Sequence, residues 1–202
     1  MSKVAIAGNA SGTGTFTIQA PNSNTDRVLS LPDEAGTVVT TGSYVAGITH
    51  MTQFRLTTNY DPGGDADITA NIEEVDNATY ARLGSAVTQS SGIFTFPTEG
   101  LWQVIAVGAV LADVDNNAGV VIQASTDSGS NYSILAISYG GQNSGTAGTD
   151  SISTTAYINC TNASTFRVKF QSQSFGNTAT TFVGNTDYNV THFTFLRIGD
   201  AQ

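Results

Sequence analysis

The fold of this chain is decided by one apolar stretch, Leu101-Trp102-Gln103-Val104-Ile105-Ala106-Val107-Gly108-Ala109-Val110-Leu111. Successive side chains of a β-strand point to opposite faces, so an antiparallel strand with one face in water alternates apolar and polar residues. This stretch is apolar at nearly every position, which predicts that both of its faces are covered. One face can fill the core of a β-sandwich. The other face needs a second cover, either a loop of the same chain or, as the simplest candidate, a neighbouring subunit.

The stretch therefore predicts a subunit interface. Which strand face is core and which is interface stays open in the sequence, and we assign the odd-numbered face, with one histidine of the last strand, to the interface. Burial of about 600 Å² of apolar area per subunit would contribute about 15 kcal/mol before the costs of association. The predicted interface residues are Leu101, Gln103, Ile105, Val107, Ala109, Leu111 and His192.

The rest of the region from residue 47 to residue 202 reads as further strands joined by Gly-rich and Asn-rich turns. The clearest period-two pattern spans residues 152–160, whose even-numbered side chains are expected to face inward. Phe54 and Leu56 share one face of an earlier strand, with Arg55 on the other. Residues 72–83 are compatible with a short helix, but no amphipathic run of ordinary helix length is present. The predicted class is all-β, an antiparallel jelly-roll β-sandwich.

The first 46 residues differ from the rest of the chain in their sequence pattern. They hold short strand-like pieces separated by turn-rich sequence, and their few apolar side chains cannot support a core of their own. Such a segment must pair with copies of itself or lie against another protein. We predict that residues 1–46 form an attachment or fibre-base segment ahead of a knob domain at residues 47–202. The predicted attachment residues are Phe16, Ile18, Leu29, Leu31 and Val38.

The charge balance argues against nucleic acid and membranes as partners. The formal net charge is −9, with only seven Lys and Arg, and nucleic-acid affinity comes mainly from cationic neutralisation of phosphates. No basic cluster suggests an anionic membrane surface. The longest apolar run is well short of the ~20 residues of a membrane-spanning helix, and the first residues lack the apolar centre of a signal peptide. We expect the product to stay in the cytoplasm until it is assembled.

The sequence offers no catalytic constellation. His50 and His192 are its two histidines, and neither stands at the spacing of a Ser–His–Asp arrangement or a metal site. We expect His50 to be exposed at the junction of the two regions. Cys160 is a lone cysteine in an alternating strand, so we expect a small buried residue and no disulfide within the chain. The chain is predicted to be no enzyme and to use no cofactor.

Two acidic loops and several tyrosines are candidates for ligand binding. Calcium takes about six to eight oxygen ligands, so neither loop would suffice alone, and solvated turns are the better interpretation. The acidic residues are Asp61, Asp65 and Asp67 in one loop and Asp113 and Asp115 in the other. Exposed aromatic rings in loops can stack on the sugar rings of a glycan. The tyrosines in or near predicted loops are Tyr60, Tyr80, Tyr132, Tyr139 and Tyr188, with no basis for choosing among them.

Two parts of the C-terminal region carry a family resemblance. They are Gly92-Ile93-Phe94-Thr95-Phe96-Pro97-Thr98-Glu99-Gly100-Leu101-Trp102 and the closing His192-Phe193-Thr194-Phe195-Leu196. These stretches resemble the jelly-roll heads of the complement and tumour-necrosis-factor superfamily. The shared features are an aromatic strand, a Pro/Gly turn, an aromatic start to the next strand and a closing aromatic strand. A tight Gly-rich closing motif of many members is only partly present. Members are trimers whose inner sheets meet at a three-fold axis, so the resemblance implies a homotrimer.

A second resemblance lies in the N-terminal segment, in Gly14-Thr15-Phe16-Thr17-Ile18-Gln19-Ala20-Pro21 and Leu29-Ser30-Leu31-Pro32-Asp33-Glu34-Ala35-Gly36-Thr37-Val38-Val39-Thr40-Thr41-Gly42. These stretches look like a segment that recurs in phage tail-fibre and other virion proteins. The shared features are a short strand, a Pro turn, a Leu-x-Leu-Pro strand and a Gly-Thr-Val sequence that leads out of the turn. There it lies near the attached end, ahead of a distal domain.

Together the resemblances imply a structural virion protein of a tailed bacteriophage, assembled in the host cytoplasm. It would be a trimeric surface fibre or knob, or a head-decoration protein, held to other virion proteins by its N-terminal segment. The first alternative is a receptor-binding tail-fibre tip whose partner is a host-surface glycan. The second is a non-viral extracellular ligand or lectin of the complement-like family.

Overall fold

The computed structural model describes residues 10–15, 17–19, 22–26, 28, 47–112, 115, 117–141, 148–176 and 180–202. The chain divides into two compact units, Met1–Gly42 and Ser43–Gln202. In the first unit the described residues are exposed and form neither strand nor helix. Ile18 is 75% exposed there, whereas Phe16, Leu29, Leu31 and Val38 lie outside the described residues. The boundary after residue 46 and the attachment role therefore stay predictions.

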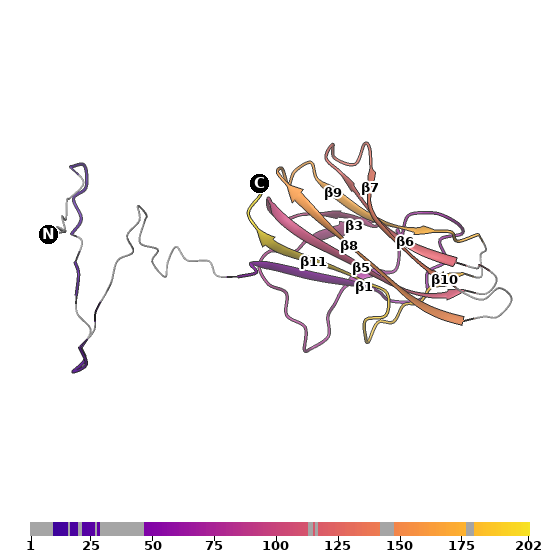
Figure 1. The fold of residues 1–202 in the computed structure, drawn as a ribbon, viewed down its shortest axis with the longest axis horizontal. Coiled ribbons are helices and arrows are strands. Elements are labelled where there is room, and N and C mark those ends of the chain that lie inside the picture. Colours follow the sequence, from indigo (N-terminus) through magenta and orange to yellow (C-terminus); the bar gives the residue numbers. More distant parts are fainter. Residues whose placement is uncertain are drawn as a thin grey trace. The chain divides into compact units, whose positions relative to one another are not determined.

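The second unit is an antiparallel β-sandwich of two sheets (Figure 1). The β5 sheet has the order β10 (Thr181–Phe182), β5 (Gly100–Ala112), β11 (His192–Gly199), β1 (His50–Leu56), β2 (Ile72–Glu74), with β8 (Gly148–Cys160) also paired to β5. The β6 sheet has the order β3 (Thr88–Ser90), β4 (Ile93–Thr95), β9 (Arg167–Gln173), β6 (Asn117–Ser125), β7 (Ser133–Gly141). The predicted all-β jelly-roll class is confirmed. In its described residues the chain has no helix that could cross a bilayer.

β5 is the central strand of its sheet and faces the core with its even-numbered residues. It pairs with β8 along its whole length, from Gly100 opposite Cys160 to Ala112 opposite Gly148, and with β11 on its other side. Trp102, Val104 and Ala106 are fully buried. The prediction that one face of this strand fills the sandwich core is confirmed.

Aromatic side chains join the two sheets at the centre of the core. Phe94 of the β6 sheet meets Phe54 of the β5 sheet edge-on, with ring centroids 5.1 Å apart. Phe170 stacks on Phe193 across the same gap, with centroids 3.9 Å apart. Each such pair contributes roughly 0.5–1.5 kcal/mol beyond the area it buries. The alternating aromatic residues of the sequence therefore become the contact between the layers.

The predicted inward residues of the other alternating strands are also in the core. Phe54 and Leu56 are buried on β1, and Ile152, Ile158 and Cys160 on β8. Period-two alternation thus placed these strand faces correctly, because a residue-by-residue alternation is fixed by the pleat of the strand itself.

The short helix considered for residues 72–83 is wrong. Residues 72–74 form β2, which pairs with β1 at Leu56 opposite Ile72 and Phe54 opposite Glu74. Asn71, just before this strand, has a φ of 59°, a left-handed conformation that Asn tolerates and that ends a loop rather than starting a helix. Pairing with an existing strand overrides the weak local preference of this segment.

The turn between β3 and β4 depends on a glycine. Its two central residues, Ser91 and Gly92, have φ values of 49° and 77°, as in the two-residue turns that match the twist of a hairpin. A Cβ at Gly92 would collide with the backbone carbonyl of Ile68. Glycine is required there for both its conformation and its lack of a side chain.

We expect Gly92→Ala to lower the free energy of unfolding by about 2–4 kcal/mol, because it combines an unfavourable φ with a backbone collision. The matched control is Gly141→Ala, since a Cβ at Gly141 would meet nothing within 4 Å. That control should change the free energy of unfolding by less than about 0.5 kcal/mol. Urea denaturation of both variants measures the difference, and equal stabilities would contradict the analysis of this turn.

Candidate subunit interface

The outward face of β5 carries the odd-numbered residues that the sequence assigned to an interface. Leu101, Gln103, Ile105, Val107 and Ala109 are half-buried, and Leu111 is exposed. Their neighbours on both sides in the sheet supply this partial cover. Within one chain, β5 is therefore fully covered on its even-numbered face only. The structure thus decides which face of β5 is core, and the interface role of the other face stays a prediction.

Strand pairing brings His192 into the same surface. His192 of β11 lies opposite Val107 of β5 and opposite Arg55 of β1. Thr194 lies opposite Ile105, and Leu196 opposite Gln103. Five of the predicted residues, Leu101, Gln103, Ile105, Val107 and His192, therefore form one continuous surface over β5 and β11. Ala109 and Leu111 extend it along β5 beside Ser151 and Thr149 of β8.

This surface is free of charged side chains along β8, β5 and β11. On β8 the outward residues are small and polar, Ser151, Ser153 and Thr155, followed by the exposed Tyr157. On β5 and β11 the outward residues between 192 and 196 and between 101 and 111 include no Asp, Glu, Lys or Arg. Covering such a surface costs little desolvation, because expulsion of water from charged groups is what makes burial expensive. We name the outward side of β8, β5 and β11 the face patch.

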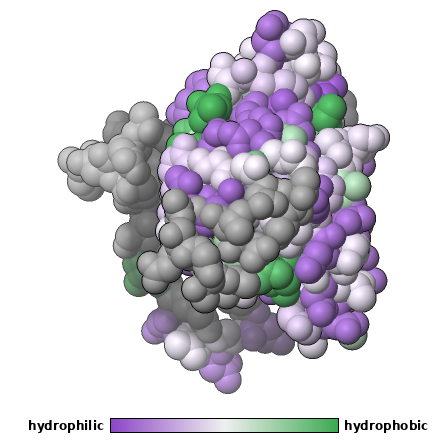
Figure 2. All heavy atoms as spheres, turned by 90° about the vertical axis from the view of Figure 1, so that its right-hand side faces the viewer, coloured by the Kyte–Doolittle hydropathy of each residue, from purple (hydrophilic) through white to green (hydrophobic). Residues whose placement is uncertain are grey.

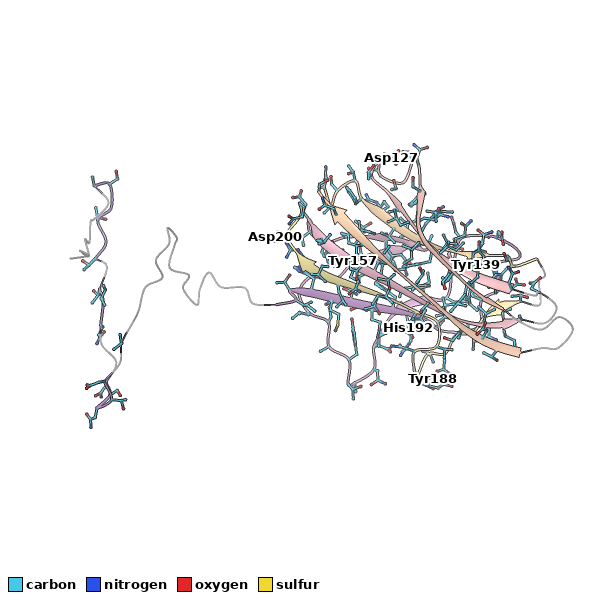
Figure 3. All side chains as sticks on the ribbon, in the orientation of Figure 1. Asp127, Tyr139, Tyr157, Tyr188, His192 and Asp200 are labelled. Atoms are coloured by element: carbon cyan, nitrogen blue, oxygen red, sulfur yellow. The ribbon has the colours of Figure 1, made fainter. Side chains whose placement is uncertain are left out.

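A second apolar surface lies on β7, the outermost strand of the β6 sheet. Its exposed large side chains are Ile134, Leu135, Ile137 and Tyr139, which we name the edge patch; Figure 3 labels Tyr139 and, on β8, Tyr157. An exposed edge strand with apolar side chains is a template for association unless something covers it. Sequence reasoning missed this surface, because a run of aliphatic residues predicts a strand without saying that it lies at the edge.

The two histidines do not form a common site. His50 opens β1 and is half-buried, with its ring centroid 5.8 Å from that of Trp102. Burial and then the positive charge of Arg197 lower the pKa of its imidazole. The expectation that His50 is exposed is therefore wrong, because its ring packs on a core residue. His192 Nδ1 lies 3.2 Å from the carbonyl oxygen of Val190.

The acidic loop residues have separate partners in the protein. The Asp61 carboxylate accepts a hydrogen bond from the Gly63 amide at 2.7 Å, and Asp67 forms an ion pair with Lys169 at 2.9 Å. Asp65 accepts hydrogen bonds from Gln173 and from the Phe175 amide. Asp115 accepts one from the Thr180 hydroxyl at 2.5 Å, and Asp113 lies outside the described residues. The described part of the chain contains no group of three or more His, Cys, Asp or Glu that could hold a metal ion.

The five tyrosines proposed for glycan stacking occupy different surroundings. Tyr60, Tyr80 and Tyr132 are half-buried, which corrects the expectation that all five are exposed. The Tyr60 hydroxyl donates to the Asp67 carbonyl at 3.1 Å, and the ring of Tyr132 lies under the Lys169 ammonium. Tyr139 is exposed, but on β7 rather than in a loop. Tyr188 is an exposed loop tyrosine, as expected.

The fold has close counterparts among solved structures, although no protein-family model and no curated protein matches the sequence. Murine APRIL at pH 8.5 matches with a TM-score of 0.53 and 9% identity, over 74% of this chain and 98% of that one. Eiger TNF from S. frugiperda matches with a TM-score of 0.57 and 10% identity, over 78% of this chain and 96% of that one. The C-terminal unit therefore has a tumour-necrosis-factor-like jelly-roll fold, as the sequence resemblance predicted.

Cys160 is expected to be unreactive in the folded protein. The thiol is buried on β8, and burial raises its pKa from 9.0 to about 11. At pH 8 the thiolate fraction is then lower by about a hundredfold than for a thiol of ordinary pKa. Iodoacetamide should label the thiol slowly in the native protein and rapidly in guanidinium chloride. Equal rates in the two conditions would show that this strand face is open to solvent.

Proposed function

We propose that this protein is a non-enzymatic structural component on the surface of a tailed-bacteriophage particle. Three jelly-roll domains associate through their apolar surfaces, and residues 1–46 hold the trimer to other virion proteins. The observation that carries the proposal is the face patch: an uncharged, partly apolar surface on β8, β5 and β11 that a single chain leaves half-exposed.

Two different apolar surfaces on one domain favour a ring over a symmetric pair. In a two-fold dimer the same patch meets itself, so one patch would be covered and the other left open. If the face patch of one chain receives the edge patch of the next, every chain uses both surfaces. Such head-to-tail contacts close into a ring when the rotation permits. The resemblance of the sequence to trimeric jelly-roll heads supports three members.

The direction of the chain in the domain also supports an attached protein. His50, at the start of β1, pairs with Arg197, near the end of β11, so the polypeptide enters the domain at the end where it finishes (Figure 1). β5 runs from this end to the opposite one, where Ala112 pairs with Gly148. Among the described residues that can be seen at the opposite end, most are hydrophilic or neutral, and the hydrophobic ones form small separate groups (Figure 2). A domain held at its entry end would present this polar end to the surroundings.

A second candidate function is that of an extracellular ligand of the tumour-necrosis-factor type. The fold match to APRIL and to Eiger TNF favours it. The two candidates share the trimer and differ in the role of residues 1–46, which only the virion proposal requires for attachment.

We expect the wild-type chain to be a trimer and Ile105→Asp to be a monomer, because the substitution places a carboxylate in the middle of the face patch, where association would bury it. The control is Ile93→Asp, since Ile93 is also a strand isoleucine but is exposed and belongs to β4 in the other sheet. That variant should remain a trimer. Light scattering at working concentration measures both, and a monomeric wild-type chain would refute the assembly.

Mixing distinguishes the ring from a symmetric pair. Ile137→Lys should also give a monomer, because it places a charge in the edge patch. An equimolar mixture of Ile105→Asp and Ile137→Lys retains one intact face–edge contact per pair of chains. The mixture should therefore form dimers and no trimers, whereas an isologous contact through the face patch would leave Ile137→Lys fully associated.

Removal of residues 1–46 should abolish incorporation of the chain into phage particles while leaving the trimer of residues 47–202 intact. The reason is that the attachment segment and the associating surfaces lie in different units of the chain. Particles produced in the presence of tagged full-length or truncated chain can be purified and probed for the tag. Undiminished incorporation of the truncated chain would refute the attachment role, and absence of the full-length chain from particles would favour the extracellular ligand.

A further inference from the structure

A small cavity opens beside the outer side of β1, between the loop that follows β2 and the loop that precedes β11. Its volume is about 270 Å³, and the residues that matter in its lining are Gln53, Arg55, Asn77, Tyr80, Tyr188 and Asn189. Tyr188 lies on the loop at the lower side of the domain in Figure 3. The cavity is just below the range of roughly 300–1,000 Å³ that is usual for drug-sized ligands. It therefore suits one small ring rather than an extended chain.

Hydrogen bonds hold the wall of the cavity in place without a ligand. The Tyr80 hydroxyl accepts from the backbone N–H of Gln53 at 2.9 Å, which leaves the phenolic proton free to be donated. The Asn189 side-chain amide donates to Gln53 Oε1 at 2.7 Å. Asn77 Nδ2 donates to the Asp187 carbonyl at 3.4 Å and so joins the two loops. A site that is preorganised in this way loses little conformational entropy when a ligand binds.

Arg55 supplies a buried donor that the protein leaves without an acceptor. Its side chain is 1% exposed and forms ion pairs with Glu73 at 2.8 Å through Nε and with Asp76 at 2.5 Å through Nη2. Nη1 is buried and has no hydrogen-bond partner. A buried donor of this kind costs free energy in the unliganded protein. Because no oxygen-sized atom can reach Nη1 in this structure, Arg55 contributes to the cavity as a lining residue and not through this nitrogen.

The charges around the cavity select a neutral ligand. The single guanidinium is already balanced by the carboxylates of Glu73 and Asp76, and Asp187 adds another carboxylate to the lining. An anion would be repelled by this surplus of negative charge and by the net charge of −9 on the chain. The other polar groups of the lining are amides and hydroxyls, which donate to and accept from uncharged hydroxyl groups. The ring of Tyr188, 62% exposed, adds an apolar face.

We propose that this cavity binds one neutral sugar ring of a glycan. Amide and hydroxyl groups of Gln53, Asn77, Tyr80 and Asn189 hold the sugar hydroxyls, and the Tyr188 ring stacks on the C–H face of the sugar. The binding function goes beyond the structural role proposed above and does not require the trimer, because every group of the cavity comes from one chain.

The test uses the full-length protein and two sets of free monosaccharides. Glucose, galactose, mannose and N-acetylglucosamine are the neutral set, and glucuronic acid and N-acetylneuraminic acid are the anionic set. Saturation-transfer NMR should detect binding of at least one neutral sugar, and titration should give the dissociation constant of that sugar. Tyr188→Ala should raise the dissociation constant of that sugar at least about tenfold. Tyr188→Phe keeps the ring, so its dissociation constant should stay within about twofold of the wild-type value. Tyr188 is exposed, so neither variant should alter folding or light scattering.

Several outcomes would overturn the proposal. They are absence of binding by every neutral sugar, preference for the anionic set, and unchanged affinity in Tyr188→Ala. Binding by the Ile105→Asp monomer but not by the wild-type chain would also overturn it, because a sister chain would then occupy the cavity. Binding by a wild-type chain that proves to be monomeric would support the cavity while refuting the trimer, so the two proposals fail separately.

Discussion

The structure depends on the position of β5 between β8 and β11. Thirteen residues of β5, from Gly100 to Ala112, pair with β8 on one side, and β11 pairs with its other side from His192 to Gly199. These two pairings fix which side chains of β5 point inward. Trp102, Val104 and Ala106 then fill the space between the sheets, and a slip by one residue would bring Gln103 into the core instead. Core and outward surface are thus determined by the same register.

The same register gives the domain an outward surface that is poor in charge. Gln103, Ile105 and Val107 lie between the neutral residues of β8 and those of β11. The edge of the other sheet adds a different apolar surface on β7, where Ile137 and Tyr139 remain exposed. A monomer would expose both surfaces to water, whereas head-to-tail association covers each with the other. The proposed assembly would therefore cover the second face of a strand whose first face fills the core.

Arg55 shows how a charge can be buried beside the face patch. Its guanidinium lies between Glu73 of β2 and Asp76 of the following loop, which compensates the charge that burial would otherwise make costly. The compensation is incomplete at Nη1, and this nitrogen belongs to a residue that lines a cavity of polar groups.

The sequence by itself determined the class of the fold and the inward faces of its strands. Phe54, Leu56, Ile158 and Cys160 could be placed in the core because alternation along a strand is a local property of the pleat. Local pattern also predicted cover on both sides of β5, of which one chain supplies only the cover on the even-numbered face. It could not say which face was outward, that β7 lies at an edge, or that residues 72–74 pair with β1. Those features depend on strand order, which is set by contacts between residues far apart in the chain. The cavity was likewise decided by tertiary structure alone, because Arg55, Tyr80 and Tyr188 come from three separate segments. No local pattern relates those segments, and only the packing of the folded domain brings them together.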